Sequence, residues 1–201
     1  CVTALRGGQT RMSDGLSDEA ELVQLIRREF SDSFTVAVDG APEGEPLESS
    51  LEGEITRLKA IQDSGADFLI TRVCWDMDIF KTWMDGIRAA GITLPVMAGV
   101  APVVDQAATI RTALATGGCA IPEDLCRLLS DYWIYPNPFA KDPFDAEVER
   151  KRVQFREAGM AYTAHQIWLY RQWGVDGIHL LTQNRAEDVP AIVRAARNPS
   201  F

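Results

Sequence analysis

Residues 65–99, GADFLITRVCWDMDIFKTWMDGIRAAGITLPVMAG, contain the pattern that decides the fold. The run 68–72 is apolar and too short for a free helix, so we expect a buried strand there. Asp76 can then cap a helix that ends at Gly91, and 94–98 repeats the strand pattern. The apolar residues of this helix recur on one face and are Phe80, Trp83, Met84 and Ile87. A strand, a helix and a strand in this rhythm form a βαβ unit, which predicts a parallel sheet covered by helices.

The rest of the chain repeats this unit. Further strands are expected at 1–5, 34–38 and 178–181. Helical patterns lie between them and begin near Asp18, Ser49, Asp105, Pro122, 145 and 188. The helix at 145–173 is expected to be interrupted at Gly159. Five βα units in which each helix follows its strand indicate an α/β fold of the (β/α)8 TIM-barrel type, although a closed barrel needs eight units and about 250 residues.

A barrel with five units has an open edge at its first strand. A buried parallel strand does not tolerate an unpaired edge, because its backbone N–H and C=O groups would pair with other chains. We therefore expect residues 2–5 to be covered by a protein partner, by a second copy of the chain or by residues upstream of Cys1. The prediction is a hetero- or homo-oligomer.

Composition limits the classes of function. The chain has 201 residues, 46% hydrophobic and 24% charged, which fits a single domain at 1–201 with one core. Its net charge of −9 argues against nucleic acid and anionic membranes as partners. No run of about 18 apolar residues is present, so we expect no membrane span. The cysteines lack metal-ligand spacing, which favours reduced thiols in an intracellular compartment, cytoplasm or organelle matrix; they are Cys1, Cys74, Cys119 and Cys126.

Five motifs follow one another in order along the chain. They are ALRG at 4–7, PEGEP at 42–46, GADFLIT at 65–71, AAGI at 89–92 with IP at 121–122, and GIHLLTQNR at 177–185. Together they resemble the methylenetetrahydrofolate reductases, a family of flavin-dependent TIM barrels of one-carbon metabolism. The resemblance implies that the fourth to eighth barrel strands are present here. It also implies a family reaction in which reduced FAD passes hydride to a folate, with a catalytic glutamate on a first strand that this chain lacks.

Positions that match the family's contacts with cofactor and substrate hold different residues in this chain. The aspartate after Leu-Arg-Gly is Gly8, the glutamine after Ile-Thr is Arg72, and the histidine in Pro-Glu-Gly-His-Pro is Glu45. The family presents an acid, an Asn and an Arg-Lys pair to FAD, and the matching residues here are Glu54, Arg57, Ala60 and Ile61. Loss of the Arg-Lys pair removes at least two charge-assisted bonds to a pyrophosphate, each worth about 1.5–3 kcal/mol.

Two arginines at strand ends have both a functional and a structural interpretation. Arg6 matches a flavin contact of the family, but it could equally form an ion pair at the end of its strand. Arg72 could clamp an anionic ligand, since barrel enzymes place their chemistry at the carboxyl ends of strands. We favour a simple ion pair for Arg72, with Asp39, Glu43 or Glu45 as its partner.

Other polar and aromatic residues have similar alternatives. Residues 182–185 follow the last strand, where many barrels bind phosphate, but Asn184 and Arg185 are better explained as a cap of the closing helix that pairs with Glu187 or Asp188. His165 and His179 have no partners at metal-ligand spacing, so we predict no metal site. The loop 132–143 holds candidate interface aromatics, namely Trp133, Tyr135 and Phe139.

Two functional hypotheses follow. The first is a degenerate, non-catalytic relative of the reductases that has lost FAD and acts as an accessory subunit of a larger assembly. The second is an active FAD-dependent methylenetetrahydrofolate reductase whose amino-terminal strands lie outside this chain. We favour the first, because truncation does not explain the changes at Gly8, Glu45, Ala60, Ile61 and Arg72, and loss of one preorganised group alone costs about a hundredfold in rate.

Overall fold

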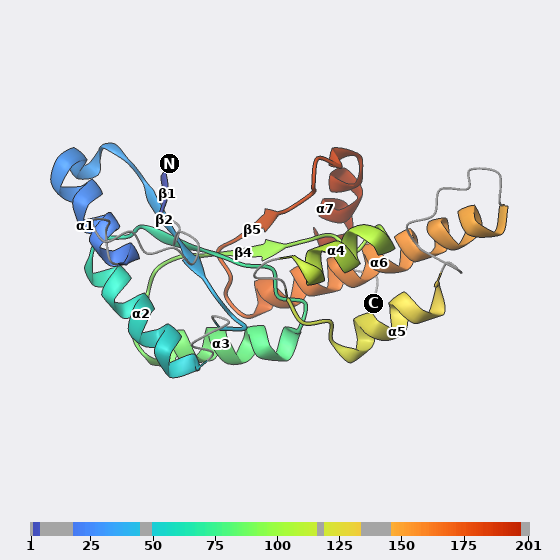
Figure 1. The fold of residues 1–201 in the computed structure, drawn as a ribbon, viewed down its shortest axis with the longest axis horizontal. Helices are drawn as coiled ribbons and strands as arrows, with labels where there is room; N and C mark the ends of the chain where they lie inside the picture. Colours follow the sequence, from blue (N-terminus) through green and yellow to red (C-terminus); the bar gives the residue numbers. More distant parts are fainter. Residues whose placement is uncertain (1, 5–17, 45–49, 116–118, 134–145, 198–201) are drawn as a thin grey trace.

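The computed structural model of the chain describes residues 2–4, 18–44, 50–115, 119–133 and 146–197 (Figure 1). Five parallel strands form one sheet in sequence order, with each strand paired to the next. The strands are β1 (Val2–Ala4), β2 (Val36–Gly40), β3 (Phe68–Thr71), β4 (Val96–Val100) and β5 (Gly177–Leu180). This sheet confirms the predicted α/β fold of a partial TIM-barrel type.

Helices follow the strands, as the βα rhythm predicts. They are α1 (Glu19–Phe30), α2 (Leu51–Asp63), α3 (Met77–Ala89), α4 (Gln106–Leu114), α5 (Glu123–Asp131), α6 (Ala146–Gln172) and α7 (Val189–Arg197), with short 3-10 turns η1 (Ser31–Ser33) and η2 (Ala186–Asp188). Figure 1 shows α1 and α2 beside the β1–β2 end of the sheet, while the long α6 extends away from the opposite end. None of the helices in the described ranges is long and apolar enough to cross a membrane.

Side-chain caps fix where helices α1 to α4 begin. Asp18 accepts a hydrogen bond from the Glu21 amide at the start of α1, and Asp76 and Asp105 begin α3 and α4 in the same way. These three caps were predicted. The cap of α2 is Ser50, one residue later than expected, and its hydroxyl accepts from the amide of Gly53.

Helix α6 is continuous, so the predicted interruption at Gly159 is wrong. A methyl group on Gly159 would overlap the carbonyl oxygen of Val103. The glycine is therefore needed for close packing of the helix on the segment after β4, and packing outweighs its low helix propensity. Thr163, one turn later, joins the same contact by accepting a hydrogen bond from the Val103 amide at 3.0 Å.

The core lies between the sheet and its helices. Alternate strand residues such as Val36, Val38 and Leu69 are fully buried there and pack with apolar residues of the helices. A second cluster centres on Trp75, Val103 and Phe155, beside α5 and the first half of α6. These two clusters fix the carboxyl ends of the strands, where the candidate site lies.

Candidate functional site

Asp39 and Arg72 form an ion pair at the carboxyl ends of β2 and β3. The Arg72 Nε donates to an Asp39 carboxylate oxygen at 2.6 Å, and its backbone amide donates to the Gly40 carbonyl at 2.9 Å. Both side chains are largely buried, with exposed fractions of 14% for Asp39 and 30% for Arg72. The expected ion pair of Arg72 with Asp39, Glu43 or Glu45 is thus formed with Asp39.

Burial governs the protonation of Asp39. It raises the pKa of this carboxyl from 3.8 to about 6, although the positive charges of Arg72 and Arg57 act in the opposite direction. The carboxylate of Glu19 adds a small further increase to this pKa. Asp39 therefore changes charge near neutral pH, which is unusual for an aspartate with a cationic partner.

Arg57 of α2 is held by acids from two helices. Its Nε donates to Glu54 at 2.9 Å, and it forms a second ion pair with Glu19 at the start of α1. The same guanidinium donates to the backbone carbonyl of Asp39 at 2.8 Å. Glu54 also accepts from the amide of Ala41 at 2.9 Å, so this acid joins α2 to the end of β2. The nearby carboxylates raise the pKa of Arg57, although burial opposes them, and the cation stays charged.

The residues at the positions of the family's Arg-Lys pair are apolar, and they differ in their exposure to solvent. Ile61 is 1% exposed and belongs to the core beneath the sheet, whereas Ala60 is exposed on the surface of α2. Neither side chain has a polar atom. Together with the pairing of Arg57, this leaves α2 with no cation at these three positions for an anionic ligand.

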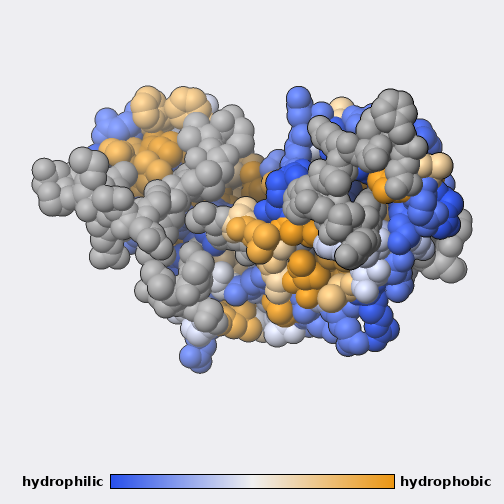
Figure 2. Space-filling view, turned by 45° about the vertical axis from the view of Figure 1, so that its right-hand side comes forward, coloured by the Kyte–Doolittle hydropathy of each residue, from blue (hydrophilic) through white to orange (hydrophobic). Residues whose placement is uncertain are grey.

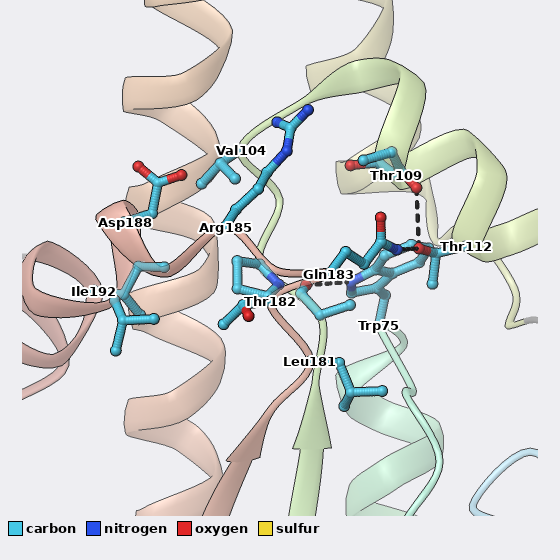
Figure 3. A pocket seen from close by; sticks show the side chains of 14 residues that line it. Trp75, Val104, Thr109, Thr112, Leu181, Thr182, Gln183, Arg185, Asp188 and Ile192 are labelled. Carbon is cyan, nitrogen blue, oxygen red and sulfur yellow. Dashed lines mark hydrogen bonds between the residues drawn. The ribbon is translucent and has the colours of Figure 1, made fainter.

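A pocket lies at the carboxyl ends of β4 and β5 (Figure 3). Trp75 forms one wall, Thr109 and Thr112 come from α4, and Gln183 and Arg185 come from the loop after β5. The indole N–H of Trp75 donates to the Ala101 carbonyl at 3.2 Å, and the Gln183 amide nitrogen donates to the Thr112 hydroxyl at 2.8 Å. Figure 2 shows a hydrophobic area in the middle of one face, next to a hollow in the surface.

The loop 182–185 differs from its predicted structural role. Arg185 pairs with Asp105 at 3.0 Å and not with Glu187 or Asp188, and no side-chain cap begins the following turn η2. Asp188 is instead buried and paired with Arg156 of α6. Neither ion pair could be predicted from the sequence, because the two residues of each pair are far apart in the chain. The packing of α4 and α6 around the last strand brings them together.

Glu43 connects two segments that are distant in sequence. It lies in the turn after β2, where the Gly44 amide donates to the Ala41 carbonyl at 2.9 Å. One carboxylate oxygen of Glu43 accepts from the backbone amide of Ala120, just before α5, at 2.9 Å. Burial raises the pKa of Glu43 above 4.5, and neighbouring Asp76 adds to the increase.

Three of the four cysteines and both histidines lie in the described ranges. Cys74 and Cys119 are buried free thiols, Cys126 is exposed and free, and burial raises the pKa of Cys119 to about 12. Within the described ranges, no group of three or more histidines, cysteines and acids could hold a metal ion. The two histidines lie apart, His165 against the ring of Trp168 in α6 and His179 in β5.

Several predicted site residues lie outside the described ranges. These are Arg6, Gly8, Glu45, Tyr135 and Phe139. Trp133 is described and is 37% exposed, and its carbonyl accepts from Lys151 of α6 at 2.8 Å. Its role in an interface stays a prediction.

Comparison with known proteins identifies the family. A family model described as methylenetetrahydrofolate reductase matches residues 2–197. The chain belongs to the methylenetetrahydrofolate reductase family. It is 35% identical over 122 residues to methylenetetrahydrofolate reductase 1 of Schizosaccharomyces pombe, which covers 58% of this chain and 20% of the relative. It is also 25% identical over 186 residues to 5,10-methylenetetrahydrofolate reductase of Escherichia coli, which covers 92% of this chain and 57% of that protein.

The match is partial with respect to length. The chain spans 22% of methylenetetrahydrofolate reductase 2 of Saccharomyces cerevisiae, to which it is 31% identical over 131 residues. It therefore corresponds to about a fifth of these fungal reductases and a little over half of the bacterial one.

Sequence reasoning missed several residues of the candidate site. Glu19 had no signal beyond its place in the first turn of α1, and its contact with Arg57 depends on the packing of α1 against α2. Thr109 and Thr112 were hidden in an ordinary helix. Trp75 was also missed, but it had a signal in the sequence. A large aromatic residue directly after a predicted buried strand could have indicated a pocket wall.

Proposed function

We propose that this methylenetetrahydrofolate reductase-like chain does not carry out flavin-dependent hydride transfer and acts as an accessory subunit of a larger assembly. The main support is the pairing of its cations at the carboxyl ends of β2 and β3. Arg57 is bound to Glu54 and Glu19, and Arg72 is bound to Asp39. A dinucleotide would have to displace these carboxylates before either guanidinium could bind its phosphates.

The residues at the expected FAD positions do not fit a flavin dinucleotide. A pyrophosphate needs cations or free amide donors, and Ala60 and Ile61 offer neither from their side chains. Ile61 is also part of the core, so its side chain packs in the apolar interior. We therefore derive no catalytic step through FAD for this chain.

The alternative is an active FAD-dependent 5,10-methylenetetrahydrofolate reductase that includes further strands. Family membership favours it, since the relatives are named as reductases. The pocket beside Trp75 and Arg185 also lies at the carboxyl ends of β4 and β5, the end of the strands at which barrel enzymes place their sites. The two functions differ in one direct observable, the binding of flavin.

Flavin binding tests the proposal. The purified protein is dialysed against FAD, and bound flavin is measured by its visible absorbance, with the Escherichia coli reductase as the positive control. We expect no stoichiometric flavin, either as purified or after dialysis. Flavin bands near saturation would overturn the proposal and favour the active reductase.

A substitution at an exposed position tests whether weak FAD binding is caused by the lack of cations or by misfolding. Ala60→Arg places one cation at an exposed position of α2 without disturbing the core. We expect this variant to have the circular dichroism spectrum of the parent and to bind FAD more tightly than the parent does. If the parent itself binds FAD as tightly as the control enzyme, the loss of cations is irrelevant and the proposal fails.

A further inference from the structure

An aspartate and an arginine join β2 and β3 at their amino ends. The carboxylate of Asp67, directly before β3, accepts from the amide of Val36, the first residue of β2, at 2.6 Å. The Asp67 amide donates in return to the Val36 carbonyl at 2.9 Å. Arg27, in the last turn of α1, pairs with the same carboxylate at 2.5 Å and donates to the Phe34 carbonyl at 2.8 Å. Asp67 therefore fastens the start of β3 to the start of β2 and to the helix before it.

The same arrangement occurs a second time at the amino ends of β4 and β5. The carboxylate of Asp176 accepts from the Val96 amide at 2.8 Å, and the Asp176 amide donates to the Val96 carbonyl at 3.0 Å. Arg88, in the last turn of α3, pairs with Asp176 at 3.6 Å and donates to the Leu94 carbonyl at 2.8 Å. We call these two sets of residues latches; the first consists of Arg27, Phe34, Val36 and Asp67, and the second of Arg88, Leu94, Val96 and Asp176.

The chain before each latch aspartate also has the same local structure. Both aspartates end the pattern Gly-x-Asp, in which Gly65 and Gly174 have φ values of +96° and +80°. In both, the amide of the middle residue donates to the carbonyl five positions earlier, at 3.4 Å and 3.1 Å. A glycine with positive φ ends a helix in this way, so it sets the position of the aspartate two residues later. One structural device is therefore used twice.

The junction between β3 and β4 has a different structure. Pro95 precedes β4 at the position of the latch aspartates, and proline has neither a carboxylate nor a backbone N–H. Strand β3 pairs with β4 over two residues, Leu69 and Ile70, whereas β2 with β3 and β4 with β5 each pair over four. Gln62 of α2 crosses the junction by accepting from the Thr93 amide at 2.8 Å. This bond is between neutral groups, so it is weaker than the charge-assisted bonds of the latches.

The carboxyl side of the same junction is held by α6. The Tyr170 hydroxyl donates to the carbonyl of Cys74 at 2.6 Å, and the Tyr162 hydroxyl donates to the carbonyl of Trp75 at 3.1 Å. These bonds tie the segment after β3 to the helix before β5. The junction is therefore fastened at its carboxyl end and has no latch at its amino end.

We propose that the strand pairs β2–β3 and β4–β5 each stay closed when the sheet opens locally, and that opening takes place between β3 and β4 from their amino ends. The latches hold each pair together, and the bonds from α6 to the segment after β3 act as the hinge. Native proteins open in contiguous units that differ in stability, and the amides of the weakest junction exchange first. This device does not rest on the proposed function, because the latches lie at the opposite ends of the strands from the candidate site.

Amide hydrogen exchange of the parent protein, measured by NMR, tests where the sheet opens. The Leu69 amide crosses the junction and donates to the Pro95 carbonyl at 2.8 Å. The amides of Arg72 and Leu181 donate within a strand pair, each at 2.9 Å. We expect Leu69 to have the lowest protection factor of the three, although it is fully buried and the other two residues follow the ends of their strands. Fraying of strand ends predicts the opposite order, and that order would overturn the proposal.

Variants of the latch aspartates test the strand pairs. Asp67→Ala should increase the exchange rates of amides in β2 and β3 about tenfold, the effect of losing a single charge-assisted hydrogen bond, and leave β4 and β5 unchanged. Asp176→Ala should do the reverse. Asp85→Ala is the matched control and should change neither pair, because Asp85 bonds to Lys81 on the exposed surface of α3. Equal acceleration of all four strands in both latch variants would overturn the proposal. If neither latch variant folds, the order of protection in the parent protein decides.

Discussion

Asp39 shows how one buried residue couples stability to pH. Its pKa is raised from 3.8 to about 6, so the folded protein binds this proton more tightly than the unfolded chain does. Ionisation of Asp39 therefore reduces stability as pH rises from 3.8 to about 6, and the reduction is constant above that range. We expect Asp39→Asn to remove this component, which urea unfolding at pH 4, 5, 6 and 7 would measure.

The partner of Asp39 provides a second test at the same scale. Arg72 lowers the pKa of Asp39, so Arg72→Met should move it above 6 and extend the pH-dependent loss of stability to higher pH. The carboxyl carbon of Asp39 reports this change directly by NMR. Arg150→Met is the matched control, because Arg150 pairs with Glu147 on the exposed surface of α6 and should not affect Asp39. An unchanged Asp39 pKa in Arg72→Met would contradict the buried ion pair.

Helix α6 depends on one small residue where it crosses the segment after β4. A methyl group on Gly159 would overlap the backbone carbonyl of Val103, and backbone cannot move aside as a side chain can. We expect Gly159→Ala to destabilise the fold by about 3 kcal/mol or more, despite the gain of about 1 kcal/mol in helix propensity. Chemical unfolding monitored by far-UV circular dichroism measures the difference.

Gly86 gives the same substitution in a different environment. A methyl group there would meet the end of the Leu51 side chain at 3.0 Å, and this flexible side chain can give way. Gly86→Ala should therefore leave stability within about 1 kcal/mol of the parent. Equal losses of stability in Gly159→Ala and Gly86→Ala would mean that overlap with the Val103 carbonyl is not the cause of the destabilisation.

At the scale of the whole molecule, the two outer strands of the sheet affect the association state of the protein in solution. Among the described strands, none pairs with the outer edge of β1 or of β5. Open parallel edges promote association, because their backbone groups form hydrogen bonds with other strands. We expect the isolated chain to sediment with a mass above that of one copy, increasing with concentration, in analytical ultracentrifugation.

An edge variant distinguishes strand association from other contacts. Thr3→Lys places a charge on β1, and such charges hinder pairing of exposed edges. Thr3→Lys should shift the sedimentation profile toward a single copy. Arg150→Met, in the first turns of α6, should leave the profile unchanged. A parent protein that sediments as one copy at all concentrations would contradict the proposed role of the edge in assembly.

The sequence by itself determined the elements and their order. Short apolar runs, helix caps at Asp18, Asp76 and Asp105, and the regular βα rhythm are local signals, and they predicted the parallel sheet correctly. The resemblance of the five motifs predicted the family correctly. It also predicted the pairing of Arg72, because acids were expected near the end of the neighbouring strand. Local chemistry was sufficient for these features.

Only the tertiary structure decided which side chains meet at the site. The contact of Glu19 with Arg57, the bond from Ala120 to Glu43 and the pair of Arg185 with Asp105 each join residues tens of positions apart. No periodicity or motif specifies such contacts, since they depend on how the helices pack around the sheet. The same reason explains the error at Gly159: a glycine breaks a helix in isolation, but here the neighbouring backbone requires it.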